Sequence, residues 1–358
     1  MKKVAIVIAD LVLGGGQRSA LNLANALSKD HDVTVITFQD NFRQYQVPCK
    51  LINLDCPDRE TVFGKAYNVL KRTCRLKRNF NINQYDYIFG FMESANFPTA
   101  LAAPKALLSV HCNPHELNKY ESLLLRLTYP RASQIIAVSE DVATILREDF
   151  AMDRVTRIYN LVSFDDIKRQ AVESFSHGRP YIVALGRLTE VKRLDLLINA
   201  YANSEMKNEC DLLLIGEGEM RESLESQIKD LSLTSNIILT GSQENPFKYL
   251  KNAEFLALSS RTEAFPMVLI ESLVLSCPVI ATDCPTGPRE IVIDGKNGLL
   301  VENENEQAMT EALDHLYFDK ELLASCREFA FESVQHLSDE RVVQEWLAVE
   351  SLYKESNS

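Results

Sequence analysis

The chain has 358 residues, of which 46% are hydrophobic and 25% charged, and this balance excludes a disordered tail protein, a fibre and a disulfide miniprotein. Its length predicts about two domains, and no apolar run approaches the ~20 residues that are needed to cross a bilayer. The net charge of −12 argues against a nucleic-acid-binding protein, and eight scattered cysteines without a C-x-x-C pair indicate reduced thiols in a cytoplasm.

Short β-branched runs alternate with helical patterns along the first half of the chain. The opening apolar run is predicted to be a buried strand and not a signal peptide, because Asp10 interrupts it and no cleavage site follows. Strands are predicted at 4–9, 33–38, 87–91, 106–110, 134–138 and 154–158, with a helix over 17–28. The order strand, helix, strand at short spacing predicts parallel pairing with helices on both faces of the sheet.

The pattern restarts after a polar stretch at 165–179, which is predicted to be a linker. Strands are predicted there at 181–185, 211–215, 237–239, 253–259, 279–282 and 298–301, and helices at 193–201, 220–230, 266–275 and 339–353. The fold class is therefore α/β, with two Rossmann-like doubly wound domains facing across a cleft. Ligands of such folds bind at the carboxyl ends of the strands.

Charge is divided unevenly between the two halves. Residues 1–165 hold 20 Lys and Arg against 17 Asp and Glu, whereas residues 166–358 hold 18 against 33. Within the first half, residues 65–78 hold six cations and no acid. We predict that this segment docks on an anionic membrane or a lipid-linked acceptor; a solvated helix face is the alternative. Its proposed docking residues are Lys71, Arg72, Arg75, Lys77 and Arg78.

Two loops that follow strands have the composition of a phosphate site. GGGQR at 14–18 opens a helix directly after the first strand, and its glycines let backbone N–H groups approach an anion. It is not the dinucleotide pattern G-x-G-x-x-G, and a tight turn explains it equally well. Arg187 follows a later strand with Lys192 five residues on, and two cations there suit a diphosphate. A solvated helix start is the alternative.

A third motif places two carboxylates around the start of a helix. Pro266 stands where a first helical position is expected, which leaves Glu263 in the preceding loop and Glu271 inside the helix. The spacing suits a sugar nucleotide, with the sugar at Glu263, phosphates at the helix start and ribose at Glu271. A helix-terminal carboxylate and a surface residue are the alternative interpretation.

These motifs occur together and in order with AVSE, IYN, IGEGEMR, PVIATDCPTGPREI and GKNGLLV. The set closely resembles the retaining glycosyltransferases of family 4, which have the GT-B fold, and in particular the bacterial enzymes that build surface polysaccharides and lipid-linked oligosaccharides. The resemblance covers nearly the whole chain and is densest at 181–301. It implies an acceptor-binding domain at 1–164 to which a C-terminal helix, 339–358, returns. It also implies a nucleotide-sugar-binding domain at 180–338.

The resemblance assigns roles residue by residue. Arg187 and Lys192 match the pair that holds the diphosphate leaving group, Glu263 faces the donor sugar, Glu271 binds ribose, and His111 lies near the reacting centre. Further donor-site residues are Gly15, Gly16, Glu217, Ala264, Phe265, Pro266, Met267 and Val268. Two departures stand out: the family usually has glycine at the positions of Ala264, beside the sugar, and of Ser276, after the helix.

No cofactor or metal is expected, since two cations and a helix start would stabilise the leaving phosphate. Asp30-His31-Asp32 fits the letters of a metal-binding D-x-D motif but is predicted to be a surface turn. The expected donor is a UDP-linked N-acetylhexosamine or hexose, and the acceptor a glycan or lipid-linked saccharide. We expect a cytoplasmic enzyme that is peripheral to the membrane. A sugar-nucleotide epimerase, a phosphorylase or a non-catalytic assembly scaffold of the same fold are the alternatives.

Overall fold

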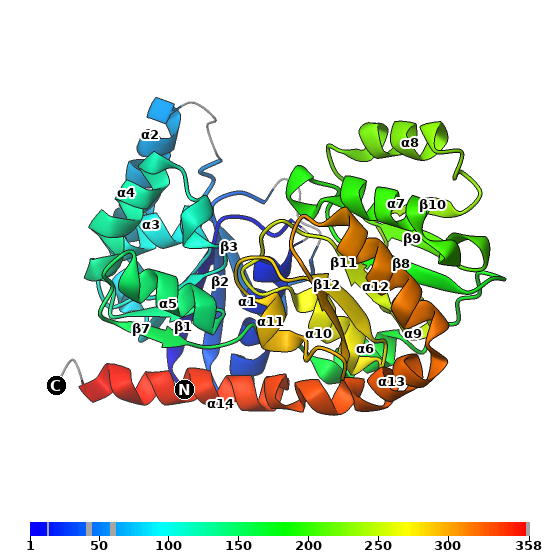
Figure 1. Cartoon of the computed structure of the whole chain (residues 1–358). Coiled ribbons are helices and arrows are strands. Elements are labelled where there is room, and N and C mark those ends of the chain that lie inside the picture. The colour runs from blue at the N-terminus through cyan, green and yellow to red at the C-terminus, as the bar shows by residue number, and fades with distance from the viewer. Residues whose placement is uncertain (13, 41–44, 58–61, 356–358) are drawn as a thin grey trace. The chain divides into compact units, whose positions relative to one another are not determined.

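The structure, a computed structural model, describes residues 1–12, 14–40, 45–57 and 62–355 (Figure 1). The chain divides into two compact units, one formed by Met1–Leu161 with Asp339–Ser358 and the other by Val162–Ser338.

The first unit contains a parallel sheet in the order β3-β2-β1-β4-β5-β6-β7. Its strands are β1 (Lys3–Ile8), β2 (Asp32–Thr37), β3 (Lys50–Asn53), β4 (Tyr87–Phe91), β5 (Leu107–Val110), β6 (Gln134–Ala137) and β7 (Val155–Arg157). The strand order reverses between β1 and β4, so the loops after these strands diverge and leave a crevice at the carboxyl edge of the sheet.

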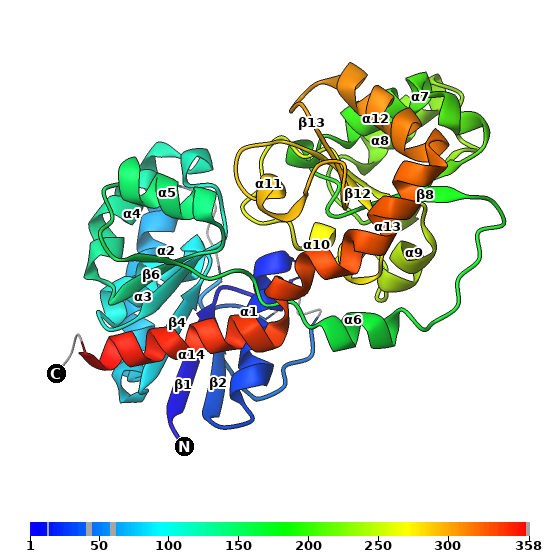
Figure 2. The same cartoon turned by 60° about the horizontal axis from the view of Figure 1, so that its bottom comes forward.

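Helices follow most of these strands, as right-handed crossovers between parallel strands require. They are α1 (Gly15–Leu27), α2 (Val62–Cys74), α3 (Glu93–Ala102), α4 (Lys119–Thr128), α5 (Glu140–Glu148) and, from the end of the chain, α14 (Asp339–Glu355). Helix α14 lies across the sheet of the first unit (Figure 2). The Trp346 ring packs edge-on against Phe89 of β4, with ring centroids 5.3 Å apart, so the last helix completes the core of the first unit.

The second unit repeats the architecture with the strand order β10-β9-β8-β11-β12-β13. Its strands are β8 (Tyr181–Leu185), β9 (Asp211–Ile215), β10 (Ile237–Gly241), β11 (Leu256–Leu258), β12 (Val279–Thr282) and β13 (Gly298–Val301). Its helices are α6 (Phe164–Gln170), α7 (Leu194–Asn203), α8 (Arg221–Asp230), α9 (Phe247–Asn252), α10 (Met267–Val274), α11 (Pro288–Ile291), α12 (Glu306–Phe318) and α13 (Lys320–Val334). Here the order reverses between β8 and β11.

The predicted strands are found close to their expected positions, and four of those in the second unit match residue for residue. Three local predictions were wrong. Strand β3 was missed because it is a short edge strand without clear alternation. The run at 253–259 forms a strand only at its centre. The expected linker contains helix α6, which packs on α9 and α10.

Candidate active site

The loops after β8 and β11 meet at the reversal of strand order in the second unit. Gly186 and Arg187 follow β8, and the segment from Ser259 to Glu263 follows β11, which pairs with β8 at Leu256 and Val183. The carboxyl ends of parallel strands meet at one edge of the sheet, so the two predicted donor-site motifs lie in the same crevice.

Glycines allow the backbones of these loops to approach one another closely. A Cβ atom on Gly216, after β9, would lie 1.8 Å from the Gly186 carbonyl oxygen, and one on Gly218 would lie 2.3 Å from that of Leu188. The Gly186 N–H donates to the Ile215 carbonyl at 3.0 Å. Only glycine fits this approach, and the GRL and IGEGE motifs therefore anchor the loop that carries Arg187 and Lys192.

Lys192 and Glu263, 71 residues apart in the chain, form an ion pair in this crevice. The Lys192 Nζ atom lies 2.5 Å from Glu263 Oε1, and the two side chains are 23% and 12% exposed. The same carboxylate oxygen accepts a hydrogen bond from Ser260 Oγ at 2.7 Å. The structure thus brings together two residues predicted for the donor site, and it presents them as a directly paired cation and carboxylate.

The Arg187 side chain is exposed, and none of the described residues forms an ion pair or hydrogen bond with its guanidinium. It therefore keeps all five donors available, and a guanidinium in this state suits a phosphate or carboxylate ligand.

Helix α10 follows the Glu263 loop and begins at Met267, one residue later than predicted, with Pro266 at the cap position. Within the described part of the chain, no acceptor takes a hydrogen bond from the backbone N–H of Ala264, Met267 or Val268. Unsatisfied N–H groups and the helix dipole favour an anion at this end. Glu271 is 4% exposed, so it is buried and not a surface residue.

The segment after β12 packs against the loop that precedes helix α10. Thr286 Oγ1 donates a hydrogen bond to the Glu263 carbonyl oxygen. A Cβ on Gly287, whose φ is +90°, would lie 2.8 Å from Pro266 Cδ and 2.9 Å from the Ala264 carbonyl oxygen. The CPTG sequence therefore packs against residues 263–266 and fixes the shape of the loop. Phe265, also predicted for the donor site, is buried in this loop.

Glu217, predicted for the nucleotide site, lies in the loop between β9 and α8. Its carboxylate accepts a hydrogen bond from Arg221 at 2.6 Å, and its backbone carbonyl accepts one from the Leu188 N–H at 2.9 Å. The backbone of Glu217 thus supports the Arg187 loop, while its side chain is half exposed.

In the first unit, the glycine loop lies beside His111. Gly15 and Gly16 form the first turn of α1, and a Cβ on Gly16 would lie 2.9 Å from Met92 Sδ and 3.5 Å from His111 Cγ. His111 follows β5, and its Nε2 atom lies 2.9 Å from Ser109 Oγ. Burial lowers the pKa of His111 to about 3, so its imidazole is neutral at physiological pH. The predicted Gly16 and His111 therefore share one crevice.

Sequence reasoning missed Glu93 and Cys112 beside this histidine. Glu93 begins α3 directly after Met92, which has a φ of +68°. Burial raises the pKa of the Glu93 carboxyl, although its own backbone, the Cys112 side chain and the His111 backbone lower it in part. Burial raises the pKa of the Cys112 thiol as well. Met92 in an unfavourable backbone conformation beside a half-buried acid is typical of a functional crevice, but neither feature has a recognisable sequence motif.

The predicted docking segment is only partly available as a surface. Arg72 is 2% exposed, donates two hydrogen bonds to the Cys56 carbonyl, and lies over the Phe38 ring, 4.6 Å from its centroid. The Arg75 guanidinium donates to the Leu54 carbonyl at 3.1 Å. The prediction was therefore wrong for Arg72, because its guanidinium donates hydrogen bonds to carbonyl groups inside the protein. The Arg75 guanidinium likewise points toward the protein and not toward solvent alone. Lys77 and Arg78 are exposed and Lys71 half-exposed, while the side chain of Lys65 lies outside the described residues.

No helix in the described ranges is both long and apolar enough to span a bilayer. The same residues contain no group of three or more His, Cys, Asp or Glu side chains arranged to hold a metal ion. Asp30 and His31 lie in the turn before β2, in agreement with the predicted turn.

Comparison with known proteins identifies the family. Residues 165–333 match "Glycosyl transferases group 1" and residues 13–166 match "Glycosyltransferase Family 4". An enzyme of Campylobacter jejuni, the N-acetylgalactosamine-N,N'-diacetylbacillosaminyl-diphospho-undecaprenol 4-alpha-N-acetylgalactosaminyltransferase, is 31% identical over 95% of this chain and 98% of its own.

The chain is a family 4 glycosyltransferase.

A second Campylobacter jejuni alpha-1,4-N-acetyl-D-galactosaminyltransferase is 26% identical to this glycosyltransferase over 97% of the chain and 98% of its own. The crystal structure of Anabaena Alr3699/HepE in complex with UDP and glucose has a TM-score of 0.80 at 18% identity, covering 98% of this chain and all of that one. The predicted family, enzyme class and GT-B fold of two Rossmann-like units are therefore confirmed.

Proposed function

We propose that this glycosyltransferase moves an N-acetylhexosamine from its UDP-sugar to a saccharide that is carried on a lipid diphosphate, with retention of the anomeric configuration. The observation that carries the proposal is the full-length similarity to two enzymes whose names specify transfer of N-acetylgalactosamine to diphospho-undecaprenol-linked saccharides. The choice of UDP is supported by HepE, whose crystal structure contains UDP and glucose.

The second unit supplies groups that suit the leaving diphosphate. Breaking the bond between sugar and phosphate passes through an oxocarbenium-like state, in which negative charge grows on the phosphate. The unpaired guanidinium of Arg187, the ammonium of Lys192 and the free N–H groups at the start of α10 provide positive potential there. In this proposal Glu263 accepts hydrogen bonds from the donor sugar and the buried Glu271 binds ribose. Gly15, Gly16 and His111 belong to the reacting centre on the acceptor side.

Two cations and a helix start carry out the charge stabilisation that a metal ion provides in other transferases. We therefore propose that the reaction needs no metal. The ability of EDTA-treated enzyme to transfer sugar tests this point directly, and loss of activity that Mg²⁺ or Mn²⁺ restores would contradict it.

The donor is tested in two steps. Calorimetry with UDP, GDP and ADP is expected to show binding of UDP alone, with binding lost in Arg187→Ala and Glu271→Ala. The enzyme is then given UDP-N-acetylgalactosamine, UDP-N-acetylglucosamine, UDP-galactose and UDP-glucose in turn, with an undecaprenyl-diphosphate-linked saccharide as acceptor. Mass spectrometry should show the addition of one N-acetylhexosamine, and NMR should show the anomeric configuration of the donor. Binding of no nucleotide, or consumption of hexose donors only, would refute the proposal.

We also propose that the first unit docks on an anionic bilayer. Exposed Leu70 and the half-exposed Lys71 lie together on α2, and on α4 exposed Leu123 and Leu127 lie on one side of the helix with Arg126. Both helices pack on α3. Leucines flanked by cations are the pattern of an interfacial membrane surface. The predicted docking surface is thereby moved from the buried Arg72 to exposed residues of α2 and α4.

Flotation with vesicles tests this docking surface. Wild-type enzyme should float with vesicles that contain phosphatidylglycerol and far less with phosphatidylcholine alone. The variant Leu123→Ser with Leu127→Ser should lose most of the binding. Leu231→Ser, which changes an exposed leucine of the second unit, is the control. Equal flotation of wild type and the double variant would refute the assignment of α4.

A further inference from the structure

Two residues of the second unit adopt a backbone conformation that favours glycine, and their side chains pair with each other. Arg193 has a φ of +48° and Glu304 a φ of +56°. The Arg193 guanidinium donates a hydrogen bond to Glu304 Oε1, across 111 residues of sequence. L-residues pay a conformational penalty in this region. Two oppositely charged residues that accept this penalty and contact each other therefore indicate that their ion pair has a structural or functional role.

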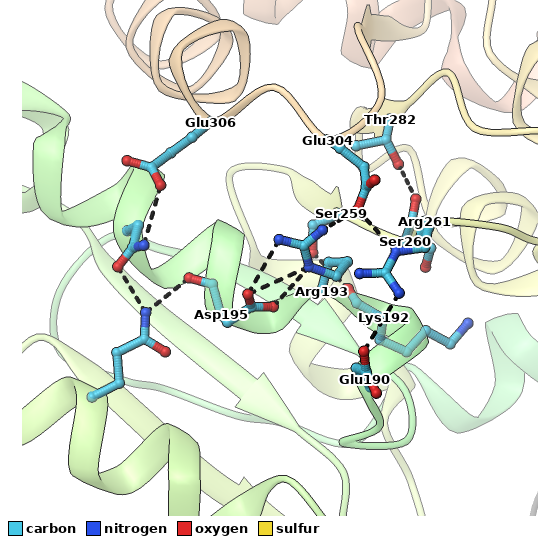
Figure 3. Close-up of polar contacts among 12 residues, drawn as sticks. Glu190, Lys192, Arg193, Asp195, Ser259, Ser260, Arg261, Thr282, Glu304 and Glu306 are labelled. Atoms are coloured by element: carbon cyan, nitrogen blue, oxygen red, sulfur yellow. Dashed lines mark hydrogen bonds and ion pairs between the residues drawn. The ribbon is translucent and has the colours of Figure 1, made fainter.

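Glu304 joins two arginines. Its Oε1 atom also accepts a hydrogen bond from Arg261 Nε at 2.9 Å, and Figure 3 shows the carboxylate with the guanidinium groups of Arg193 and Arg261. At its other end, Arg261 lies 3.5 Å from Glu190. We refer to Arg193, Glu304 and Arg261 as the carboxylate bridge. It ties together loops that follow β8, β11 and β13.

Two residues of the carboxylate bridge are close in sequence to the residues of the Lys192–Glu263 pair. Arg193 directly follows Lys192, and Arg261 precedes Glu263 by two residues. The backbone joins the same loops, because the Arg261 N–H donates to the Val191 carbonyl at 2.8 Å. Ser259 Oγ also donates to the Lys192 carbonyl at 2.8 Å. Two hydrogen bonds thus join the two loops directly next to the ion pair.

We propose that the carboxylate bridge positions the Lys192 ammonium and the Glu263 carboxylate relative to each other, so that Arg193, Glu304 and Arg261 are positioning residues for sugar transfer. The proposal rests on the function proposed for Lys192 and Glu263. The Glu304 and Arg261 side chains are 45% and 42% exposed, and ion pairs with such exposure contribute little to folding stability. We therefore assign to the carboxylate bridge the positioning of the loops that carry Lys192 and Glu263. The hydrogen bond from Arg261 lowers the pKa of Glu304, which keeps the carboxylate ionised in mildly acidic solution.

The test replaces Arg193→Gly and Glu304→Gly together. Glycine adopts both backbone conformations without penalty, so the fold is expected to persist while the bridge is lost, together with the ion pair between Arg193 and Asp195 at 3.1 Å. We expect kcat for transfer from the UDP-sugar to fall about tenfold, since small misplacements of catalytic groups carry large costs in rate. KM for the acceptor should change less than twofold. Hydrogen exchange of the amides at 187–193 should become faster in the absence of any ligand.

Two controls separate positioning from stability. Glu254→Gln breaks a comparable ion pair, with Arg327, at 3.2 Å in the same unit, and it should leave kcat unchanged. Glu304→Asp with native Arg193 should keep part of the activity that the double-glycine variant loses. A double-glycine variant with wild-type kcat, or with unchanged exchange at 187–193, would overturn the proposal. If wild-type enzyme bound no nucleotide, the proposed function would fail, whereas the exchange data would still decide whether the bridge orders the loop.

Discussion

The Lys192–Glu263 pair gives the sharpest prediction for catalysis. In Lys192→Ala, the ammonium that lies 2.5 Å from Glu263 Oε1 is removed, whereas Ser260 Oγ still donates to that oxygen at 2.7 Å. We expect the variant to fold and to lose most of its transfer activity, because Lys192 is the paired cation of the proposed diphosphate site.

The magnitude follows from how far the pair is buried. Breaking a fully buried ion pair costs about 3–5 kcal/mol and an exposed one at most about 1 kcal/mol. Side chains that are 23% and 12% exposed lie between these limits, and the remaining bond from Ser260 moderates the loss. We expect a loss of about 1–2 kcal/mol in the free energy of unfolding, or a Tm lower by about 2–8 °C. Loss of a group that stabilises developing charge should reduce kcat about 100- to 1,000-fold.

The assay measures UDP release with donor and acceptor, together with thermal unfolding. Lys248→Ala is the matched control, since Lys248 is 19% exposed, lies 2.6 Å from Glu173 and belongs to α9 of the same unit. It removes the same charge from a similarly buried lysine, although its partner Glu173 is 53% exposed, and it should leave kcat within twofold of wild type. If Lys192→Ala kept kcat within threefold of wild type, or lost no more activity than Lys248→Ala, the role assigned to Lys192 would be refuted.

Three further predictions concern protonation and backbone geometry. The pKa of His111 is lowered to about 3 in the folded chain, so the unfolded chain binds more protons between pH 6.5 and 3, and stability falls as pH falls through this window. His111→Asn should therefore remove up to about 2 kcal/mol of the stability loss measured by urea unfolding between pH 7 and pH 5; an unchanged slope would contradict the neutral imidazole. Ser276, after α10, has a φ of +57°, and Ser276→Gly should raise the unfolding free energy by about 0.5–1 kcal/mol in the same assay, whereas a lower value would argue against a strained position. Gly216→Ala should lower it by about 3 kcal/mol or more, because the new methyl would lie 1.8 Å from the Gly186 carbonyl oxygen; a well-folded variant with native Tm would contradict this packing.

The sequence predicted the architecture well because both sheets are parallel and buried. Their strands are continuous apolar runs, such as those at 3–8 and 211–215, and the intervening helices have one apolar face or are apolar throughout. The same reasoning failed for strand β3, whose four residues are exposed or half-exposed at the edge of the sheet. A strand that buries little leaves little pattern in its sequence.

The candidate site was predicted unevenly, for a related reason. Gly216, Gly218 and Gly287 are visible in the sequence because the close approach of two backbones tolerates no side chain. Glu93 was missed because a single acid at a helix start has many possible surroundings, and its burial depends on β5 and on the loop that follows it. Arg72 was misassigned for the opposite reason, since a cation inside a basic segment gives no sign that buried carbonyl groups will accept its hydrogen bonds.

The charges of the second unit explain why the sequence could predict the proposed diphosphate site but not the contacts within it. Both the sequence and the structure place the cations Arg187 and Lys192 after the end of strand β8. The structure also distinguishes them, because Lys192 forms an ion pair with Glu263, whereas Arg187 has no partner among the described residues. We therefore propose that an incoming diphosphate is attracted first by Arg187 and the start of α10, and that Lys192 contributes once its ammonium is shared between Glu263 and the phosphate. This difference between the two cations depends on a contact between residues that are 71 positions apart. The spacing of residues within a motif contains no information about such a contact.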